Sequence, residues 1–274
     1  MLNSVKKVIK EQIEYRDLIF RMAFFDIRSQ YQNHYLGALW QIITPAIQIA
    51  IYWFVFGIGI RGGAPIQTTL GEVPFVLWML MGLIPWFFIS PSILQGSNSV
   101  HQKVSLVSKM NFPISILPTT KLVGSSFSFI IMMFVLIIAL LIYGIPPTLY
   151  WIQLIYYLIC LYLFLFAFVI LSSTISTLVR DYQSLLQSTM RMLLYLSPIL
   201  WDPEGDRVPE WMTNILKLNP FYYILDGFRS SFLARGWFFE DLIYTIYFWS
   251  FTFTLLYFGS KIHLKFRKDF IDYL

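Results

Sequence analysis

The chain has 274 residues, of which 57% are hydrophobic and only 13% are charged, and its formal net charge is +5. A soluble domain of this size carries about a quarter charged residues, because its surface faces water. The composition therefore excludes an ordinary water-soluble fold and is typical of a protein whose surface faces lipid. The one cysteine, Cys160, excludes an intramolecular disulfide.

Residues 4–28 separate apolar from charged side chains on a helical wheel. One half holds Val5, Val8, Ile9, Ile13, Ile19, Phe20 and Ala23. The other half holds most of the charged residues, Lys10 among them, and Arg16 is the exception. This pattern is typical of a helix that lies in the membrane interface. The alternative is an amphipathic helix that packs on a soluble partner.

The apolar segments predict an all-α integral membrane protein with six transmembrane helices. Crossing the hydrocarbon core takes about 20 apolar residues. Five stretches have this length: Leu36–Ile60, Val73–Leu94, Ile114–Tyr143, Leu149–Val179 and Asp241–Ile262. A sixth, Tyr182–Trp201, is long enough but contains Arg191. Six crossings place both termini on one side of the membrane.

The basic residues predict which side that is. With both termini in the cytoplasm, most Lys and Arg residues fall on cytoplasmic segments. The outer segments then hold only Arg61, Arg207, Lys217, Arg229 and Arg235. This distribution follows the positive-inside rule, so the net positive charge is explained by topology and does not indicate nucleic-acid binding.

A polar segment separates the second and third spans. Val100, Val104 and Val107 recur at helical spacing within it, and Pro113 closes it. Because residues before proline avoid the α region, we expect a short cytoplasmic helix over 100–110. Such a helix is either a simple connector or a surface that docks into a soluble motor.

The outer connection over 202–238 contains two shorter apolar pieces, 211–218 and 220–233. The second piece is too short to cross a bilayer and too apolar for an open loop. We expect two short re-entrant helices, sheltered by protein or by a water-filled cavity. Asp226 and Arg229 are three residues apart in the second piece, a spacing at which they can pair locally as structural pins.

Arg191 is the ionisable residue expected deepest in a span. It lies ten residues after Asp181, which corresponds to about 15 Å along a helix. It either snorkels toward the inner surface or faces a polar pathway and meets anionic groups of a substrate. Arg180 and Asp181, at the inner end of the fourth span, are expected to form an ion pair with another helix or a partner.

The sequence contains none of the usual enzymatic patterns. His34, His101 and His263 have no second ligand at metal spacing. No Gly-rich loop ends in Gly-Lys-Ser/Thr, so nucleotide phosphates have no cradle in this chain. We therefore expect a permease without catalytic or metal-binding residues and without a cofactor of its own.

Several short segments resemble the ABC-2 type permeases that export lipid-linked polysaccharides and polyol-phosphate polymers. In chain order they are Tyr35–Trp40 with Pro45, Gly82–Trp86, Lys109–Pro113 with Leu117 and Pro118, Arg180-Asp181, Ser197-Pro198, and Asn219-Pro220 through Arg229. Within the family, residues 29–37 and 104–113 look most like the wall teichoic acid permeases of Gram-positive bacteria. The permeases for O-antigen and capsule polysaccharide are the near alternative, and a channel or carrier that works without ATP is a more distant one.

The resemblance implies partners that the residues alone do not. Two copies of this permease would assemble with two copies of a separate ATPase, which binds ATP and Mg²⁺. The complex would move a polymer on an undecaprenyl-diphosphate type carrier across the bacterial plasma membrane, with both termini cytoplasmic.

The resemblance also implies roles for individual residues. The segment that couples to the ATPase would present Val100, His101, Lys103, Val104, Leu106, Val107 and Lys109. Candidates for an aromatic-rich polymer path are Arg191, Tyr195, Trp201, Phe221 and Tyr222. Structural or gating roles fall to Lys10, Arg16, Arg180, Asp181, Asp226 and Arg229.

Overall fold

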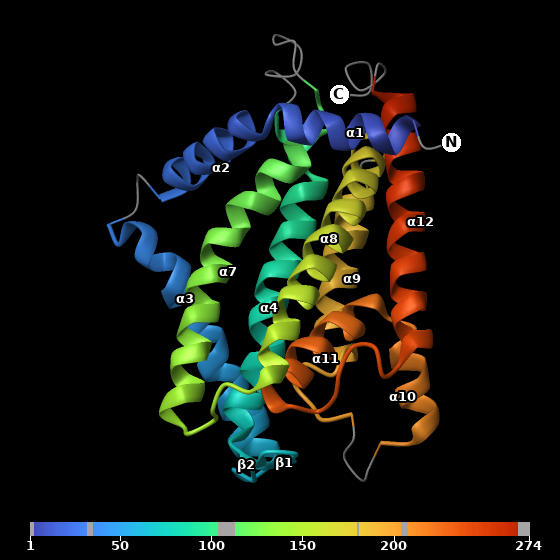
Figure 1. Ribbon diagram of the computed structural model, residues 1–274. Coiled ribbons are helices and arrows are strands. Elements are labelled where there is room, and N and C mark those ends of the chain that lie inside the picture. Colours follow the sequence, from blue (N-terminus) through green and yellow to red (C-terminus); the bar gives the residue numbers. More distant parts are fainter. Residues whose placement is uncertain (1–2, 32–34, 104–112, 180, 204–207, 268–274) are drawn as a thin grey trace.

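The structure is a computed structural model that describes residues 3–31, 35–103, 113–179, 181–203 and 208–267. It is an all-α membrane protein, as the sequence predicts, with long helices running side by side (Figure 1). Five helical segments among the described residues are long and apolar enough to cross a membrane. They are α3 (Trp40–Tyr52) with its π-helical continuation η2 (Trp53–Ile60), α4 (Phe75–Ser97), α7 (Ile116–Ile142), η3 (Leu149–Ile152) with α8 (Gln153–Leu178), and α12 (Leu242–Phe266).

The sixth expected span is a shorter helix. α9 (Tyr182–Leu196) has 15 residues, fewer than the roughly 20 that usually cross the hydrocarbon core, and it runs along α4 from Leu94 toward Trp78 only together with the segment that follows it. It ends because Ser197 has an extended backbone, with ψ at 140°, and this residue precedes Pro198, which disfavours the helical conformation. The segment after α9 remains buried as far as Leu200.

The core of the bundle forms where α4 packs against α7 and α8, and α8 against α12. Two glycines allow helices to approach closely. A Cβ on Gly96 of α4 would lie 2.8 Å from Val169 of α8, and a Cβ on Gly227 would lie 2.0 Å from the Tyr157 ring. Both distances are shorter than van der Waals contact, so these positions require glycine for the helices to pack this closely.

The outer connection folds into the two short helices expected there, α10 (Glu210–Lys217) and α11 (Pro220–Leu233). α11 starts with Pro220 in its first turn, and the Asn219 side chain accepts a hydrogen bond from the Phe221 N–H at 3.0 Å. Most of α11 is buried against α4, α8 and η3. An apolar segment of this length is therefore stabilised by protein contacts on nearly all sides.

A hairpin between η2 and α4 was not expected from the sequence. β1 (Ile66–Thr68) pairs antiparallel with β2 (Gly71–Val73), and Gly71 has a positive φ of 99°. The Thr69 hydroxyl in the turn donates a hydrogen bond to the Leu233 carbonyl, so the hairpin is joined to the end of α11.

The N-terminal segment forms two helices rather than one. α1 (Asn3–Glu14) and α2 (Arg16–Tyr31) are separated at Tyr15. α1 lies across the end of the bundle beside the C-terminal end of α12, and α2 extends outward over α7 (Figure 1). Two short helices complete this end of the described chain: η1 (Gly37–Leu39) and α5 (Ser99–Gln102).

Candidate functional site

α1 is attached to the body of its own chain. Glu11 accepts a 2.7 Å ion-pair contact from Arg267 and a hydrogen bond from the Ser115 hydroxyl. The Gln12 amide donates to the Ser115 carbonyl at 3.2 Å. Val8 is buried beside these contacts, so this helix packs on the permease itself as well as presenting exposed apolar side chains such as Ile13.

The two basic residues assigned to gating in this region point outward. Lys10 and Arg16 are both exposed. The Arg16 Nε lies 3.8 Å from the Asp17 carboxylate, and both side chains are more than two-thirds exposed. An ion pair in that setting contributes little to stability, so their roles as gating residues remain predictions.

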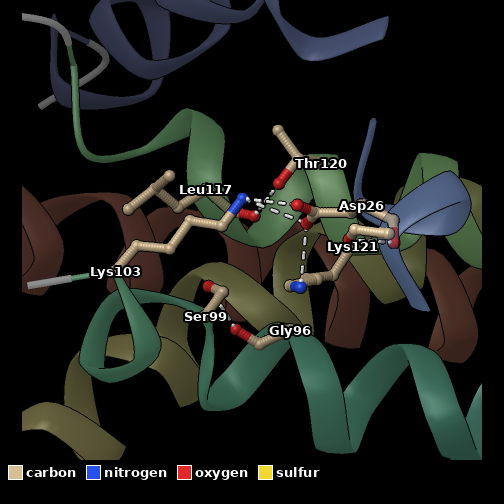
Figure 2. Close-up of polar contacts among 8 residues, drawn as sticks. Asp26, Gly96, Ser99, Lys103, Leu117, Thr120 and Lys121 are labelled. Carbon is tan, nitrogen blue, oxygen red and sulfur yellow. Dashed lines mark hydrogen bonds and ion pairs between the residues drawn. The ribbon is translucent and has the colours of Figure 1, made fainter. Parts of the chain in front are cut away.

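An ion-pair cluster joins α2, α7 and Lys103, the residue directly after α5 (Figure 2). The Lys103 Nζ lies 3.0 Å from both Asp26 carboxylate oxygens, and the Lys121 Nζ lies 2.9 Å from one of them. Partial burial raises the pKa of Asp26, but hydrogen bonds from Lys121 and Lys103 lower it more, so the net shift of this pKa is downward. The carboxylate is therefore ionised at neutral pH and holds three segments together.

This cluster contains two residues that sequence reasoning missed. Asp26 and Lys121 are separated by 95 positions, and no spacing rule links them. The sequence offers only a weak signal for this cluster. Asp26 is an acidic residue in a predicted interfacial helix, and the predicted ends of the second and third spans on the same side carry the lysines Lys103 and Lys121. Such complementarity becomes specific only when the fold brings α2 over α7.

The predicted coupling segment is only partly within the described residues. Val100 is fully buried and packs with Ile114 and Leu117, so its side chain faces the core in this structure. His101 is exposed and Lys103 is held by Asp26. Four of the proposed coupling residues lie outside the described residues: Val104, Leu106, Val107 and Lys109.

α9 presents an exposed polar face. Its buried side holds Leu186 and Met190, which pack into the bundle. The opposite side exposes Ser184, Gln187, Ser188, Arg191 and Tyr195. These positions recur every three or four residues, so they form one stripe. The Arg191 Nε is 3.4 Å from the Gln187 carbonyl, and the guanidinium otherwise points away from the described chain.

The other path candidates lie elsewhere. Trp201 is half-buried, and its indole N–H donates to the Tyr195 carbonyl at 2.9 Å. Phe221 and Tyr222 are buried in the core, where the Phe221 ring makes edge contacts with Trp86 and Phe164. The structure thus places Arg191 and Tyr195 on the exposed side of α9, joins Trp201 to the backbone of Tyr195, and separates Phe221 and Tyr222 from them.

Arg229 has a different partner from the one expected. Asp226 lies 3.8 Å from Arg235 in an ion pair. The fully buried Arg229 guanidinium instead donates to the Pro198 carbonyl and, at 3.0 Å, to the Ile199 carbonyl. The predicted Asp226–Arg229 pair is therefore wrong, because two backbone carbonyls left free where α9 ends attract the buried donor more closely.

The same guanidinium lies over the Trp78 ring of α4, 3.5 Å from its centroid. A Cβ at Gly82 would come within 2.7 Å of its Nη2 atom, so glycine provides the space for it. Arg229 thereby joins α11, α4 and the end of α9 into one unit. At the other end of α9, Asp181 is exposed, and Arg180 lies outside the described residues.

The part of the chain that the structure describes contains no group of three His, Cys, Asp or Glu side chains able to hold a metal ion. Its polar clusters are ion pairs and hydrogen bonds between helices. Arrangements of this kind position helices and line pathways.

Comparison with known proteins agrees with this architecture. Residues 18–233 match the family of ABC-2 type transporters. The chain is 26% identical over 259 residues to a Klebsiella pneumoniae protein named O-antigen export system permease protein RfbA, covering 94% of this chain and 95% of the relative. A Myxococcus xanthus protein of the same name is 23% identical over 228 residues, covering 82% and 84%. With a match over most of its length and helices that suit a membrane, the chain belongs to the ABC-2 type transporter family.

Proposed function

We propose that this chain is the membrane-spanning permease of an ATP-driven exporter of a lipid-linked polysaccharide of the O-antigen kind. The named relatives support this cargo over wall teichoic acid, which residues 29–37 and 104–113 favour in the sequence. The family match supports assembly with a separate ABC ATPase. That partner would bind ATP and Mg²⁺, since this sequence has no phosphate-binding loop.

The observation that carries the proposal is the polar face of α9. This face of a helix within the membrane bundle exposes four polar side chains: Ser184, Gln187, Ser188 and Arg191. Facing lipid with these groups costs free energy, and burying an arginine costs a few kcal/mol. A second copy of the chain or a polar conduit between two copies removes that cost. The phosphates of an undecaprenyl-diphosphate type carrier are the groups that Arg191 would meet.

The orientation proposed is a bacterial plasma membrane with α1 and the end of α12 on the cytoplasmic side. These two elements lie at the same end of the bundle, where Glu11 and Arg267 are paired. The basic residues concentrated there support this orientation. Lys103, which lies within the predicted coupling segment, would carry motion of the ATPase to α2 and α7 through Asp26.

The test is reconstitution of the permease with its ATPase in proteoliposomes. ATP hydrolysis is measured with lipid-linked O-antigen, lipid-linked teichoic acid or the carrier lipid alone. We expect the O-antigen to stimulate hydrolysis most and to appear in the opposite compartment only with ATP. Stronger stimulation by teichoic acid would reassign the cargo, and ATP-independent flux through the permease alone would contradict the exporter.

A further inference from the structure

A cavity of about 880 Å³ lies between α2, α3, α4 and α7. The α2 helix with Asp26 forms part of its lining at the end of the bundle, and α3 forms a wall that stands apart from the core. The lining includes Gln41, Gln48, Gln95, Gln102, Lys121 and Ser128. This site is separate from the polar face of α9, because no α9 residue lines it.

Three glutamines in the cavity lining have side chains that are unused within the described chain. The side-chain amides of Gln41, Gln48 and Gln95 form no hydrogen bond to another described residue. Gln48 lies eight residues into α3 and Ser128 twelve residues into α7, or about 12 Å and 18 Å along each helix. Polar groups at that depth need a polar partner, since hydrocarbon offers none.

The charge of the cavity favours an anion. Lys121 and Lys103 share the single carboxylate of Asp26, so one positive charge is not neutralised within the cluster. Lys121 itself lines the cavity. A phosphate group accepts hydrogen bonds from an ammonium and from glutamine amides together, which matches this set of donors.

The surroundings favour an anion that carries acyl chains. The cavity lining includes the apolar side chains of Ile27, Trp40, Phe87 and Met132, which come from α2, α3, α4 and α7. Apolar side chains on both walls suit lipid tails, and the interfacial α2 helix lies at the level of headgroups. A soluble phosphate compound would gain nothing from these walls.

We infer that this cavity binds the headgroup of an anionic membrane phospholipid, with its phosphate on Lys121 and its hydroxyls on the glutamine amides. The inference does not depend on the cargo of the transporter. In this assignment a bilayer lipid occupies the space between α3 and α7, and the transported polymer contacts the polar face of α9.

The experiment titrates the delipidated full-length chain in detergent with phosphatidylglycerol and follows binding by native mass spectrometry. Phosphatidylcholine and soluble glycerol phosphate are the comparison ligands. We expect Lys121→Met to weaken phosphatidylglycerol binding about tenfold, the loss expected for one charge-assisted contact. Ser128→Leu narrows the cavity without touching the Asp26 ion pairs, and we expect it to weaken binding as well.

Lys261→Met is the matched control, because Lys261 is an exposed lysine of α12 outside the cavity. Unchanged binding in this control together with weaker binding in Ser128→Leu supports the site, even if Lys121→Met fails to fold. Equal binding of phosphatidylcholine, or glycerol phosphate binding as tightly as the lipid, would overturn the assignment. Displacement of phosphatidylglycerol by the lipid-linked polymer would also overturn it, in favour of a cargo site.

Discussion

The first two spans have equal mean hydropathy but opposite environments. Only 6% of the most apolar stretch of α3 with η2 is buried, compared with 72% of that of α4. Hydropathy therefore identifies a helix that belongs in a membrane and says nothing about whether lipid or protein surrounds it. The two helices differ in how their small and polar residues are arranged.

α4 uses its glycines to bring other helices close. Gly82 makes room for Arg229, and Gly96 makes room for Val169. α3 instead has Gln41, Thr44 and Gln48 on one side, all lining the cavity. One copy of the chain thus completes the packing around α4 but leaves α3 and the outward side of α9 to be covered by lipid, by a conduit or by a second copy.

Among the buried helices, a substitution at Gly227 of α11 is expected to cause the largest loss of stability. A Cβ there would lie 2.0 Å from Tyr157, so Gly227→Ala is expected to destabilise the protein by about 3 kcal/mol through overpacking. The control is Gly59→Ala in η2, where the nearest atom lies 3.5 Å from the new Cβ. Thermal unfolding followed by size-exclusion chromatography measures both, and equal midpoints would show that α11 is not packed as described.

Arg229→Met tests the next largest effect. It leaves the Pro198 and Ile199 carbonyls without their donor, which is expected to cost about 2–4 kcal/mol. Arg191→Met is the same chemical change on the exposed side of α9 and should alter the unfolding midpoint little. If the two variants lose stability equally, burial does not distinguish these arginines.

Asp26→Asn removes the shared acceptor of Lys103 and Lys121, at an expected cost of about 1–2 kcal/mol. The pKa of Asp26 is lower in the folded protein than its ordinary value of 3.8. The ionised carboxylate therefore stabilises the fold fully at pH values above 3.8, and this stabilisation is lost as the pH falls from 3.8 through the lowered pKa of the folded state. The difference between wild type and variant should therefore be constant from pH 6 to 8, within about 0.5 kcal/mol. Calorimetry across this range checks it, and a difference that changes steeply near neutrality would contradict it.

Arg191→Gln should have the smallest effect on stability and a clear effect on function. An exposed side chain changes the free energy of unfolding by about 0.5 kcal/mol or less. If the polar face of α9 contacts the cargo, polymer-stimulated ATP hydrolysis falls while basal hydrolysis is unchanged. Normal polymer-stimulated ATP hydrolysis by a correctly assembled variant complex would show that Arg191 does not contact the polymer.

The fold was largely predictable because its determinants are local. Apolar runs separated by Gly, Pro and charged residues mark each long span, and the short length of 220–233 indicates the non-spanning α11. The early end of α9 was also encoded, since Pro198 forces an extended conformation on Ser197. The predicted span Tyr182–Trp201 continues past this point because the residues after Pro198 are also apolar.

The contacts of the site were less predictable because they join distant segments. Asp226 and Arg229 fit a local pairing rule, yet Arg229 binds carbonyls about 30 positions away and Asp226 pairs with Arg235. Val100 fits an exposed docking helix by its spacing, yet it is buried against Ile114. Periodicity gives the face of a helix on which a residue lies, and only the packing of neighbouring helices decides whether that face is covered.

The two ends of α9 are both fixed to α4. At its N-terminal end, the Gln183 amide donates to the Leu94 carbonyl at 3.0 Å and accepts from Ser97 at 2.8 Å. At its C-terminal end, Arg229 binds the carbonyls that follow α9 while lying on Trp78. α4 and α9 are thus joined at both ends, and α4 also lines the cavity with Phe87, Pro91 and Gln95. A ligand in the cavity that moves α4 is therefore expected to move α9 with it.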